Sequence, residues 1–375
     1  MKTIGLIGGM SWESSVVYYQ LINRRVKELA GGNHSCKSVM YTVDFDQIVS
    51  LQHSGDWNKL NSIMADSALR CEKAGAEAIV LCTNTMHLCK DAIIENISVP
   101  FIHIAHATGD AISLWGFQKV GLLGTKFTME MEFYKKELKD NFGIETIVPE
   151  EIDRETVHNI IFKELIKGEI KGESRKKVIS IIDKLKESGA EGVILGCTEI
   201  PLLIGEKDVD IPIFDTTKIH AYKAVDFALQ GMELQPVVIE RVVEMSASEV
   251  WKNLTDRERM KIWYFDIPDF TVKVGETFSF YEPGGENQFL HRCKVLEVIP
   301  EKLLKHTWTH PNHSKGETIL SWELEEIADE LGEVRTFVRL SHKGIENLSD
   351  GGPALCRESY EAGWEEIVKT LSELK

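Results

Sequence analysis

Short apolar runs alternate with longer amphipathic segments over the first 230 residues of the chain. The apolar runs are rich in β-branched side chains, as buried strands are, and they span 3–7, 39–43, 78–81 and 99–104. Between them, apolar residues recur at helical spacing, first as Val16, Tyr19, Ile22, Val26 and Leu29 and then as Trp57, Leu60, Met64 and Cys71. Apolar strands that alternate with amphipathic helices predict a parallel sheet in an α/β domain.

The same pattern then begins again. Val120-Gly121-Leu122-Leu123-Gly124 echoes Ile4-Gly5-Leu6-Ile7-Gly8 at an offset of 116, and Cys82 and Cys197 are 115 positions apart. An offset that stays nearly constant over about 100 residues indicates an internal duplication, with halves of about 1–115 and 116–230. Two such copies are expected to face each other across a cleft. Ligands in open α/β sheets bind outside the carboxyl ends of the strands, so we expect a site there.

The pattern changes after a linker at 230–236. Strand-like alternation with many aromatic residues follows, at 237–245, 277–281, 289–299, 303–309, 318–324 and 335–341. Ser246 and Glu249 form a capping box that opens a helix. A long amphipathic helix closes the chain, with Tyr360, Trp364, Ile367 and Leu371 on one face. We predict an α+β domain over 236–375, in which an antiparallel sheet curls around the final helix.

Charge and cysteine content exclude several classes of protein. The net charge of −16 argues against general binding to nucleic acid or to anionic membranes, although a local pocket can still hold an anionic substrate. The seven cysteines contain no Cys-x-x-Cys pair and the histidines lack metal spacing, so no metal site is expected. Free thiols and the lack of a long apolar run predict a cytoplasmic protein that does not span a membrane.

The candidate chemistry lies in the repeated stretch. Gly-Ala-Glu, an apolar run and Cys-Thr occur in this order at 75–83 and at 189–198, which places Cys82 and Cys197 at the tips of two buried strands. Two thiols on opposite faces of Cα can racemise an amino acid, because one thiolate removes the proton while the other thiol delivers one. A free thiol has a pKa of about 8.5, and we expect the helix that follows each strand to lower it. The alternative for any single cysteine is a buried structural role, which we keep for Cys36, Cys71, Cys89, Cys293 and Cys356.

Other candidates have two interpretations each. Gly8-Gly9-Met10 is either a tight turn or a contact for a substrate carboxylate. Lys163 either meets a side-chain carboxylate or is solvated, and Gln52 is equally ambiguous. The polar residues after the two thiols either bind the α-carboxylate and α-ammonium or cap helices, and they are Thr83, Asn84, Thr85, Thr198 and Glu199. The aromatic residues after 236 either line a cavity or form a plain core, which we favour.

Residues 1–230 resemble the aspartate/glutamate racemase superfamily, in its aspartate-racemase-like, broad-specificity branch. The resemblance rests on the motifs at 5–14, 80–87 and 196–200. It implies a two-base mechanism that needs neither pyridoxal phosphate nor another cofactor, with Cys82 and Cys197 as the catalytic pair. It also implies substrate contacts from Met10, Gln52, Thr83, Asn84, Thr85, Thr198 and Glu199.

The chain departs from the family at two places. Glutamate racemases carry His where Glu199 stands, and aspartate-specific members use an arginine near Gln52, whereas no arginine lies between Gly32 and Leu69. Lys163 matches the basic residue that aspartate-specific members direct at the side-chain carboxylate. The substrate is therefore expected to be aspartate or one of several amino acids.

Residues 236–375 are similar to the START-like (SRPBCC) superfamily, in the branch named after the activator of heat-shock protein ninety ATPase. The motifs are Ile239-Glu240-Arg241-Val242-Val243, Ser248-Glu249-Val250-Trp251 and Gly363-Trp364-Glu365. The resemblance implies a helix-grip fold with a cavity, and hence an apolar ligand or a chaperone as partner.

We therefore expect an amino-acid racemase fused to a START-like domain, and a homodimer as in many family members. The alternatives are a cysteine-dependent decarboxylase or isomerase of a small dicarboxylic acid, and a non-catalytic fusion that senses an amino acid and binds a ligand.

Overall fold

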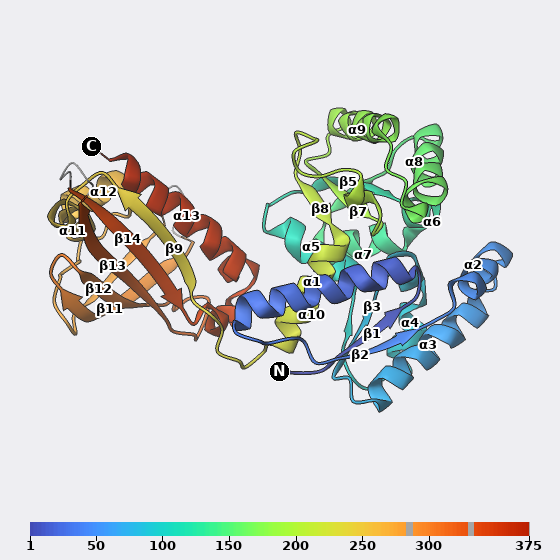
Figure 1. Ribbon diagram of the computed structural model, residues 1–375, viewed down its shortest axis with the longest axis horizontal. Helices are drawn as coiled ribbons and strands as arrows, with labels where there is room; N and C mark the ends of the chain where they lie inside the picture. The colour runs from blue at the N-terminus through green and yellow to red at the C-terminus, as the bar shows by residue number, and fades with distance from the viewer. Residues whose placement is uncertain (283–287, 329–333, 375) are drawn as a thin grey trace. The chain divides into compact units, whose positions relative to one another are not determined.

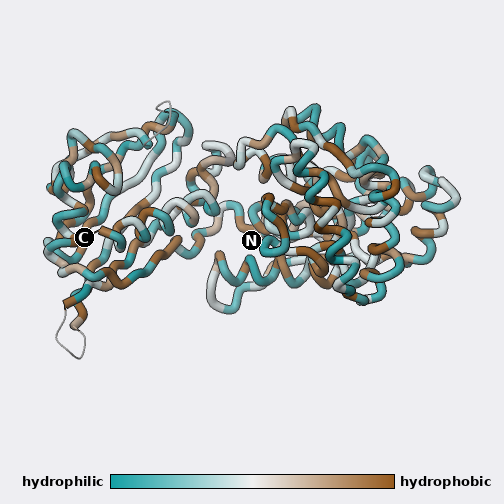
Figure 2. Tube along the Cα trace, turned by 90° about the horizontal axis from the view of Figure 1, so that it is seen from above, coloured by the Kyte–Doolittle hydropathy of each residue, from teal (hydrophilic) through white to brown (hydrophobic). Residues whose placement is uncertain are grey.

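The computed structural model describes residues 1–282, 288–328 and 334–374. The chain forms two compact units, Met1–Met232 and Glu233–Lys375 (Figure 1). Along the helices of both units, hydrophobic and hydrophilic positions alternate, as expected for helices with one buried face (Figure 2). We propose residues 1–230 and 236–375 as the two domains of the chain. None of the helices in the described ranges is long and apolar enough to cross a membrane.

The first half of the first unit contains a parallel four-stranded sheet in the order β2-β1-β3-β4. Its strands are β1 (Ile4–Gly8), β2 (Ser38–Thr42), β3 (Ala78–Leu81) and β4 (Phe101–Ile102). The fourth strand was expected over 99–104 but contains only two residues. His103 ends it because its ring accepts a hydrogen bond from the N–H of Ala105 and so caps the next helix, α5 (Ile104–Ser113).

Helices cover this sheet on both faces. They are α1 (Trp12–Ala30), α2 (Phe45–Ser54), α3 (Trp57–Lys73) and α4 (Lys90–Ile94), with a short 3₁₀ helix, η1 (Thr85–Cys89), directly after the first thiol-bearing strand. The prediction for α3 is confirmed for Leu60, Met64 and Cys71, which are buried, whereas Trp57 is only partly buried. The prediction for α1 was partly wrong. Val16 and Tyr19 are exposed, and Tyr18, which lies between them, is buried.

The second half repeats the topology of the first, in the order β6-β5-β7-β8. Its strands are β5 (Lys119–Gly124), β6 (Glu145–Ile147), β7 (Gly192–Gly196) and β8 (Ile213–Asp215), all parallel. Its helices are α6 (Lys126–Glu130), α7 (Glu132–Phe142), α8 (Glu151–Lys163), α9 (Gly172–Glu187) and α10 (Thr216–Ala228), with 3₁₀ helices η2 (Leu165–Lys167) and η3 (Ile200–Leu202). The identical strand order is what a duplication predicts.

Two helices connect the halves. Helix α5 leaves the first sheet and packs with α7 over the second sheet, whereas α10 leaves the second sheet and packs against α1 and α5. The carboxyl ends of the central strands, β1 and β3 in one half and β5 and β7 in the other, lead to the cavity described below.

The second unit is an α+β domain with a six-stranded antiparallel sheet in the order β10-β11-β12-β13-β14-β9. The strands are β9 (Val237–Val243), β10 (Thr277–Tyr281), β11 (Leu290–Ile299), β12 (Leu303–Trp308), β13 (Thr318–Ala328) and β14 (Val334–Lys343). Its helices are α11 (Ala247–Thr255), α12 (Arg257–Trp263), η4 (Ile345–Gly351), η5 (Pro353–Leu355) and α13 (Arg357–Glu373). The predicted helix-grip arrangement is confirmed: Trp364, Val368 and Leu371 of α13 are buried in the core of the sheet.

Candidate active site

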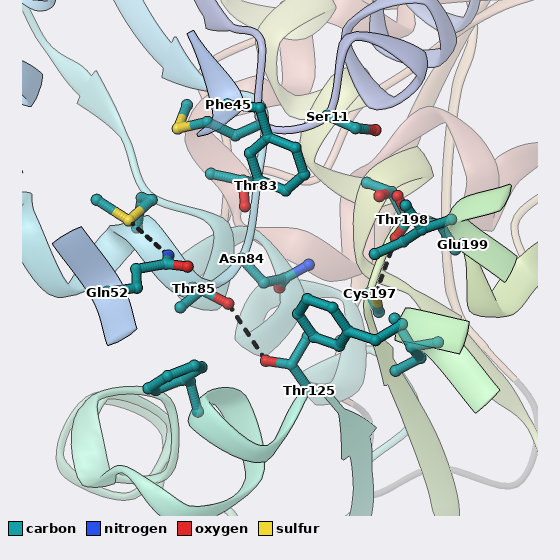
Figure 3. A pocket seen from close by; sticks show the side chains of 17 residues that line it. Ser11, Phe45, Gln52, Thr83, Asn84, Thr85, Thr125, Cys197, Thr198 and Glu199 are labelled. Atoms are coloured by element: carbon teal, nitrogen blue, oxygen red, sulfur yellow. Dashed lines mark hydrogen bonds between the residues drawn. The ribbon is translucent and has the colours of Figure 1, made fainter. Parts of the chain in front are cut away.

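A cavity of about 60 Å³ lies in the first unit, at the ends of the central strands of both halves. Ser11, Thr83, Asn84 and Thr85 reach it from the first half (Figure 3). Thr125, Cys197, Thr198 and Glu199 reach it from the second half and, in Figure 3, the last three lie across the cavity from Thr83 and Thr85. The cavity thus occupies the position that the duplication predicted.

Cys197 follows β7 directly and lines the cavity, with 7% of its surface exposed. Its Sγ donates a hydrogen bond of 2.9 Å to Oε2 of Glu199. The other carboxylate oxygen, Oε1, accepts a 3.3 Å bond from the hydroxyl of Ser14, which also lies 2.7 Å from the hydroxyl of Thr198. Helix α1 of the first half therefore orients the carboxylate that contacts the thiol of the second half.

Burial raises the pKa of the Cys197 thiol well above its usual value, and the negative charge of Glu199 and the bond to it raise it further. The backbone N–H groups of Glu199 and Thr198 act in the opposite direction but do not outweigh burial. The expectation that a following helix lowers the thiol pKa is therefore wrong. Only the three-residue 3₁₀ helix η3 follows Cys197, too short to offset desolvation.

Cys82 follows β3 in the equivalent position but is fully buried and does not line the cavity. Burial raises the pKa of this thiol too, and the neighbouring thiol of Cys71 adds to the effect. The expectation that both thiols face the cavity thus holds for Cys197 but not for Cys82, although the two residues that follow Cys82, Thr83 and Asn84, line the cavity.

Asn84 occupies the place in the first half that Glu199 occupies in the second, two residues after the thiol. Its Nδ2 donates a 3.1 Å hydrogen bond to the hydroxyl of Thr216. Its Oδ1 is buried and has no hydrogen-bond partner among the described residues. A buried polar atom without a partner is unusual, and one in the wall of a cavity is suited to accept a hydrogen bond from a ligand.

The remaining predicted residues divide into two groups. Met10, Gln52, Thr83, Thr85 and Thr198 all line the cavity. The hydroxyls of Thr85 and Thr125 lie 3.3 Å apart across the two halves, and Nε2 of Gln52 donates to Sδ of Met86 at 3.1 Å. Lys163 is exposed and does not line the cavity, although the adjacent Phe162 does.

The glycine loop after β1 is a tight turn. Gly9 has a φ of +93°, and a side chain there would meet the backbone oxygen of Val43 at 2.3 Å. The N–H of Gly9 donates to the hydroxyl of Ser15 at 2.8 Å and is not free to bind a carboxylate. The turn instead brings the next residues, Met10 and Ser11, to the cavity.

Several lining residues were not identified from the sequence: Ser11, Phe45, Met86, Thr125, Phe127, Ile161, Phe162 and Ile166. Thr125 carried a usable signal, because it follows β5 at the duplication offset from Gly9. The aromatic and aliphatic residues lie on helices and looked like ordinary core positions.

A buried histidine, His87, holds the backbone of Thr83 in the cavity wall. His87 Nδ1 lies 2.8 Å from the carbonyl oxygen of Thr83, and its Nε2 accepts a 3.2 Å bond from the N–H of Ile104. Nδ1 must therefore carry the proton and donate it to Thr83. Burial lowers the pKa of His87 well below its usual value, so the ring is neutral and fixes the backbone next to Cys82.

Among the described residues, His103, His106 and Glu137 form a group that could hold a metal ion, with ligand atoms within 4.8 Å of one another. None of the three lines the cavity. Glu137 already forms an ion pair with Lys90 and lies 2.8 Å from Nε2 of His106, and the nearby ammonium group of Lys90 opposes binding of a cation.

Comparison with known proteins agrees with this architecture. Residues 7–224 match the family model described as Asp/Glu/Hydantoin racemase, and residues 244–374 match the model described as Activator of Hsp90 ATPase homolog 1-like protein. Among curated proteins, the chain is similar to the broad specificity amino-acid racemase RacX of Bacillus subtilis (strain 168). The two are 24% identical over 232 residues, which cover 59% of this chain and 96% of RacX.

Two crystal structures resemble the first unit. One is a protein of Asp/Glu racemase type from Yersinia pestis, with 49% identity and a TM-score of 0.59, and the match covers 61% of this chain and 100% of that one. The other is an aspartate racemase homologue from Pyrococcus horikoshii OT3, with 37% identity and a TM-score of 0.56, covering 61% of this chain and 99% of that one.

Proposed function

Because the chain belongs to the Asp/Glu/Hydantoin racemase family, we propose that its first unit interconverts the enantiomers of an amino acid by removing and returning the proton on Cα. The observation that carries the proposal is the hydrogen bond from Cys197 to Glu199 in the wall of the cavity. A thiol that already donates to a carboxylate has an acceptor for its proton and can become the thiolate that acts as a base.

In the proposed reaction, the Cys197 proton moves to Glu199 and the thiolate removes the α-proton of one enantiomer. Cys82 delivers its thiol proton to the opposite face of the carbanion. The cycle runs in reverse for the other enantiomer, with Cys82 as the base. Cys82 is fully buried and does not line the cavity, so this step requires a small rearrangement of the turn after β3 when substrate binds.

The polar walls suit the two charged groups of an amino acid. Asn84 Oδ1 accepts a hydrogen bond from the α-ammonium group, and the hydroxyls of Ser11 and Thr85 donate to the α-carboxylate. The reaction as proposed uses only side chains of this protein. A pyridoxal enzyme forms a Schiff base with a lysine, and no lysine is among the residues that line the cavity.

Proton exchange at Cα tests the proposal. Single L-amino acids are incubated with the protein in deuterated water, and deuterium at Cα and the D-enantiomer are followed together. Cys82→Ala is expected to retain exchange of one enantiomer without inversion, because Cys197 can still remove and return a proton. Cys197→Ala is expected to retain exchange of the opposite enantiomer only. Full racemisation by either variant, or no exchange by the wild type with a broad panel, would contradict the two-thiol mechanism.

The burial of Cys82 favours a second candidate in which one thiol acts alone. A decarboxylase of a small dicarboxylic acid needs only one acid to protonate the carbanion that forms when CO₂ leaves. Release of CO₂ from 2-substituted malonates, lost in Cys197→Ala and kept in Cys82→Ala, would support this candidate over the racemase.

For the second unit we propose a small, largely apolar ligand with one hydrogen-bond acceptor. Its cavity of about 270 Å³ is lined mainly by apolar and aromatic residues such as Phe289, Trp308 and Trp364, with Glu282 and His291 among the polar ones. His310 Nε2 receives bonds from the indole N–H of Trp308 and the hydroxyl of Tyr360, so Nδ1 carries the proton. This buried Nδ1 has no partner among the described residues.

Burial lowers the pKa of His310 to about 3, so the ring is neutral and offers a donor to an uncharged acceptor. Binding of 2-naphthol and of naphthalene is measured by quenching of tryptophan fluorescence. We expect 2-naphthol to bind more tightly, because its oxygen can accept a hydrogen bond from His310. His310→Phe is expected to remove the difference. Failure of both probes to bind the full-length protein would favour the alternative, a chaperone partner.

A further inference from the structure

Besides its polar residues, the active-site cavity is lined by a group of aromatic and aliphatic side chains. Phe45 comes from α2, Phe127 from α6, Ile161 and Phe162 from α8, and Ile166 from η2. Elements of both halves therefore contribute to one apolar surface. The position of this surface, next to the polar residues that would hold the α-carboxylate and α-ammonium, makes it the surroundings of the substrate side chain.

The charges of the cavity lining are unbalanced. Glu199 is the acidic residue of the lining, and no lysine, arginine or histidine is among the lining residues. A carboxylate on the substrate side chain would be removed from water without a cationic partner, while the Glu199 charge repelled it. Burial of an unpaired charge is among the most costly changes in a protein interior.

Lys163, the cation that the sequence suggested for a side-chain carboxylate, does not line the cavity. Lys163 follows Phe162 on α8, but its side chain is exposed to solvent and does not reach the lining. On an α-helix, adjacent residues point about 100° apart. With Phe162 directed at the cavity, Lys163 is directed past it.

We propose that the substrate side chain is uncharged and predominantly apolar, and that aspartate and glutamate are excluded. This inference rests on the proposed racemase function and specifies its substrate class. Gln52 provides the second amide in the lining, besides Asn84, which we assign to the α-ammonium group. Gln52 Nε2 donates one of its two protons to the thioether of Met86, so the other N–H and Oε1 can contact a neutral amide side chain such as that of asparagine.

Three amino acids of nearly equal shape test the proposal. Leucine, asparagine and aspartate share the same branching at Cγ and differ in polarity and charge. Rates of deuterium exchange at Cα are measured for each with the wild-type protein. We expect leucine to exchange at least 100-fold faster than aspartate, with asparagine between them. Equal or faster exchange of aspartate would overturn the substrate class but would support the racemase function. No exchange with any amino acid of a broad panel would overturn the racemase function itself.

Two variants at Gln52 separate charge from shape. Gln52→Lys places a cation beside the apolar surface, and we expect it to reduce the leucine-to-aspartate rate ratio at least tenfold. Gln52→Met has a similar length without charge, and the ratio is expected to stay the same or rise. A Gln52→Lys variant with an unchanged ratio would contradict the electrostatic explanation.

Lys163→Met tests the alternative cation. We expect the ratio to stay within twofold of wild type, because the Lys163 side chain lies outside the cavity. A selective loss of aspartate exchange in Lys163→Met would show that Lys163 reaches the substrate and would overturn the proposal.

Discussion

The thiol of Cys197 donates a 2.9 Å hydrogen bond to the carboxylate of Glu199, two residues further along the chain. The equivalent position after Cys82 holds Asn84, whose amide cannot accept a proton at neutral pH. The two halves therefore share a topology but differ in the acid–base character of their thiols. We expect Cys197 to be the thiol that begins the cycle as a base.

Glu199→Gln should lower the pKa of Cys197. The negative carboxylate opposes ionisation of the thiol next to it, so a neutral amide makes the thiolate less costly. The rate of Cys197 alkylation by iodoacetamide, followed against pH by mass spectrometry, is expected to reach its midpoint at a lower pH. Glu206→Gln, which removes an exposed carboxylate seven positions further along the chain than Glu199, is the control and should leave the midpoint unchanged. An upward shift in Glu199→Gln would mean that the carboxylate does not face the thiol.

The same Glu199→Gln variant should racemise more slowly, by about 10²–10⁴-fold, because it has lost the group that accepts the thiol proton. Enantiomers have equal free energy in water, so kcat/KM must fall by the same factor in both directions. Chiral chromatography from each enantiomer measures the two values. Activity close to wild type would show that the proton leaves Cys197 by another route.

Asn84→Ala should weaken binding of the substrate ammonium group. A hydrogen bond to a charged group contributes about 1.5–3 kcal/mol, so kcat/KM is expected to fall about 10- to 100-fold, mainly through KM. Thr216→Val is the matched control. It removes the hydroxyl that accepts from Asn84 Nδ2 but leaves Oδ1 in the cavity wall. An equal loss of activity in both variants would indicate a structural role for Asn84.

Gly9→Ala should destabilise the first unit by about 2–4 kcal/mol, because the new Cβ would have a φ of +93° and would meet Val43 O at 2.3 Å. Gly116→Ala has a φ of +69° but open space around the Cβ, and it should cost only about 1 kcal/mol. Labelling of the buried Cys71 thiol in increasing urea reports unfolding of this unit. Similar costs for the two variants would show that the turn can move away from Val43.

Acid should destabilise the first unit through His220. Burial lowers the pKa of this ring to about 4 in the folded protein, against about 6.5 when unfolded. The unfolded chain therefore binds the proton first. Stability is unaffected above the unfolded pKa and is lost as the pH falls from about 6.5 towards 4. At pH 5 the loss from this residue alone is about 2 kcal/mol.

His220→Gln should be less stable at pH 7 but should depend less on pH between 7 and 5. The slope of unfolding free energy against pH, again from Cys71 labelling in urea, checks this. His87 and His103 are also buried with lowered pKa values, so part of the slope should remain. An unchanged slope would mean that His220 is protonated in the folded protein.

The strands and the thiols could be predicted from the sequence because their signals are local. Runs such as 78–81 are apolar throughout, and a repeat at constant offset places Cys82 and Cys197 at matching strand ends. The same reasoning found both Asn84 and Glu199, which follow the thiols in the chain.

The direction in which a helical side chain points could not be predicted in the same way. The apolar residues of α1 fit helical spacing, yet the rotation of the helix buries Tyr18 and leaves Val16 and Tyr19 exposed. Lys163 differs from Phe162 by one position, and only packing against the second sheet decides which of them faces the cavity. The full burial of Cys82 depends on tertiary packing, which has no signature in the strand itself.

The position of His220 also has a mechanical consequence. Its Nε2 donates to the carbonyl of Ile102 at 2.7 Å, and its Nδ1 accepts from the hydroxyl of Tyr18 at 2.9 Å, so a helix of the second half is fastened to the first half by directional bonds. On the side of α3 and α6, the halves meet through an aromatic contact, with the rings of Trp57 and Phe127 6.4 Å apart. We expect an opening motion of the two halves to separate the rings of Trp57 and Phe127 while the hydrogen bonds of His220 persist. Trp57→Ala should then release product faster, and turnover limited by that release should depend on solvent viscosity more than on salt.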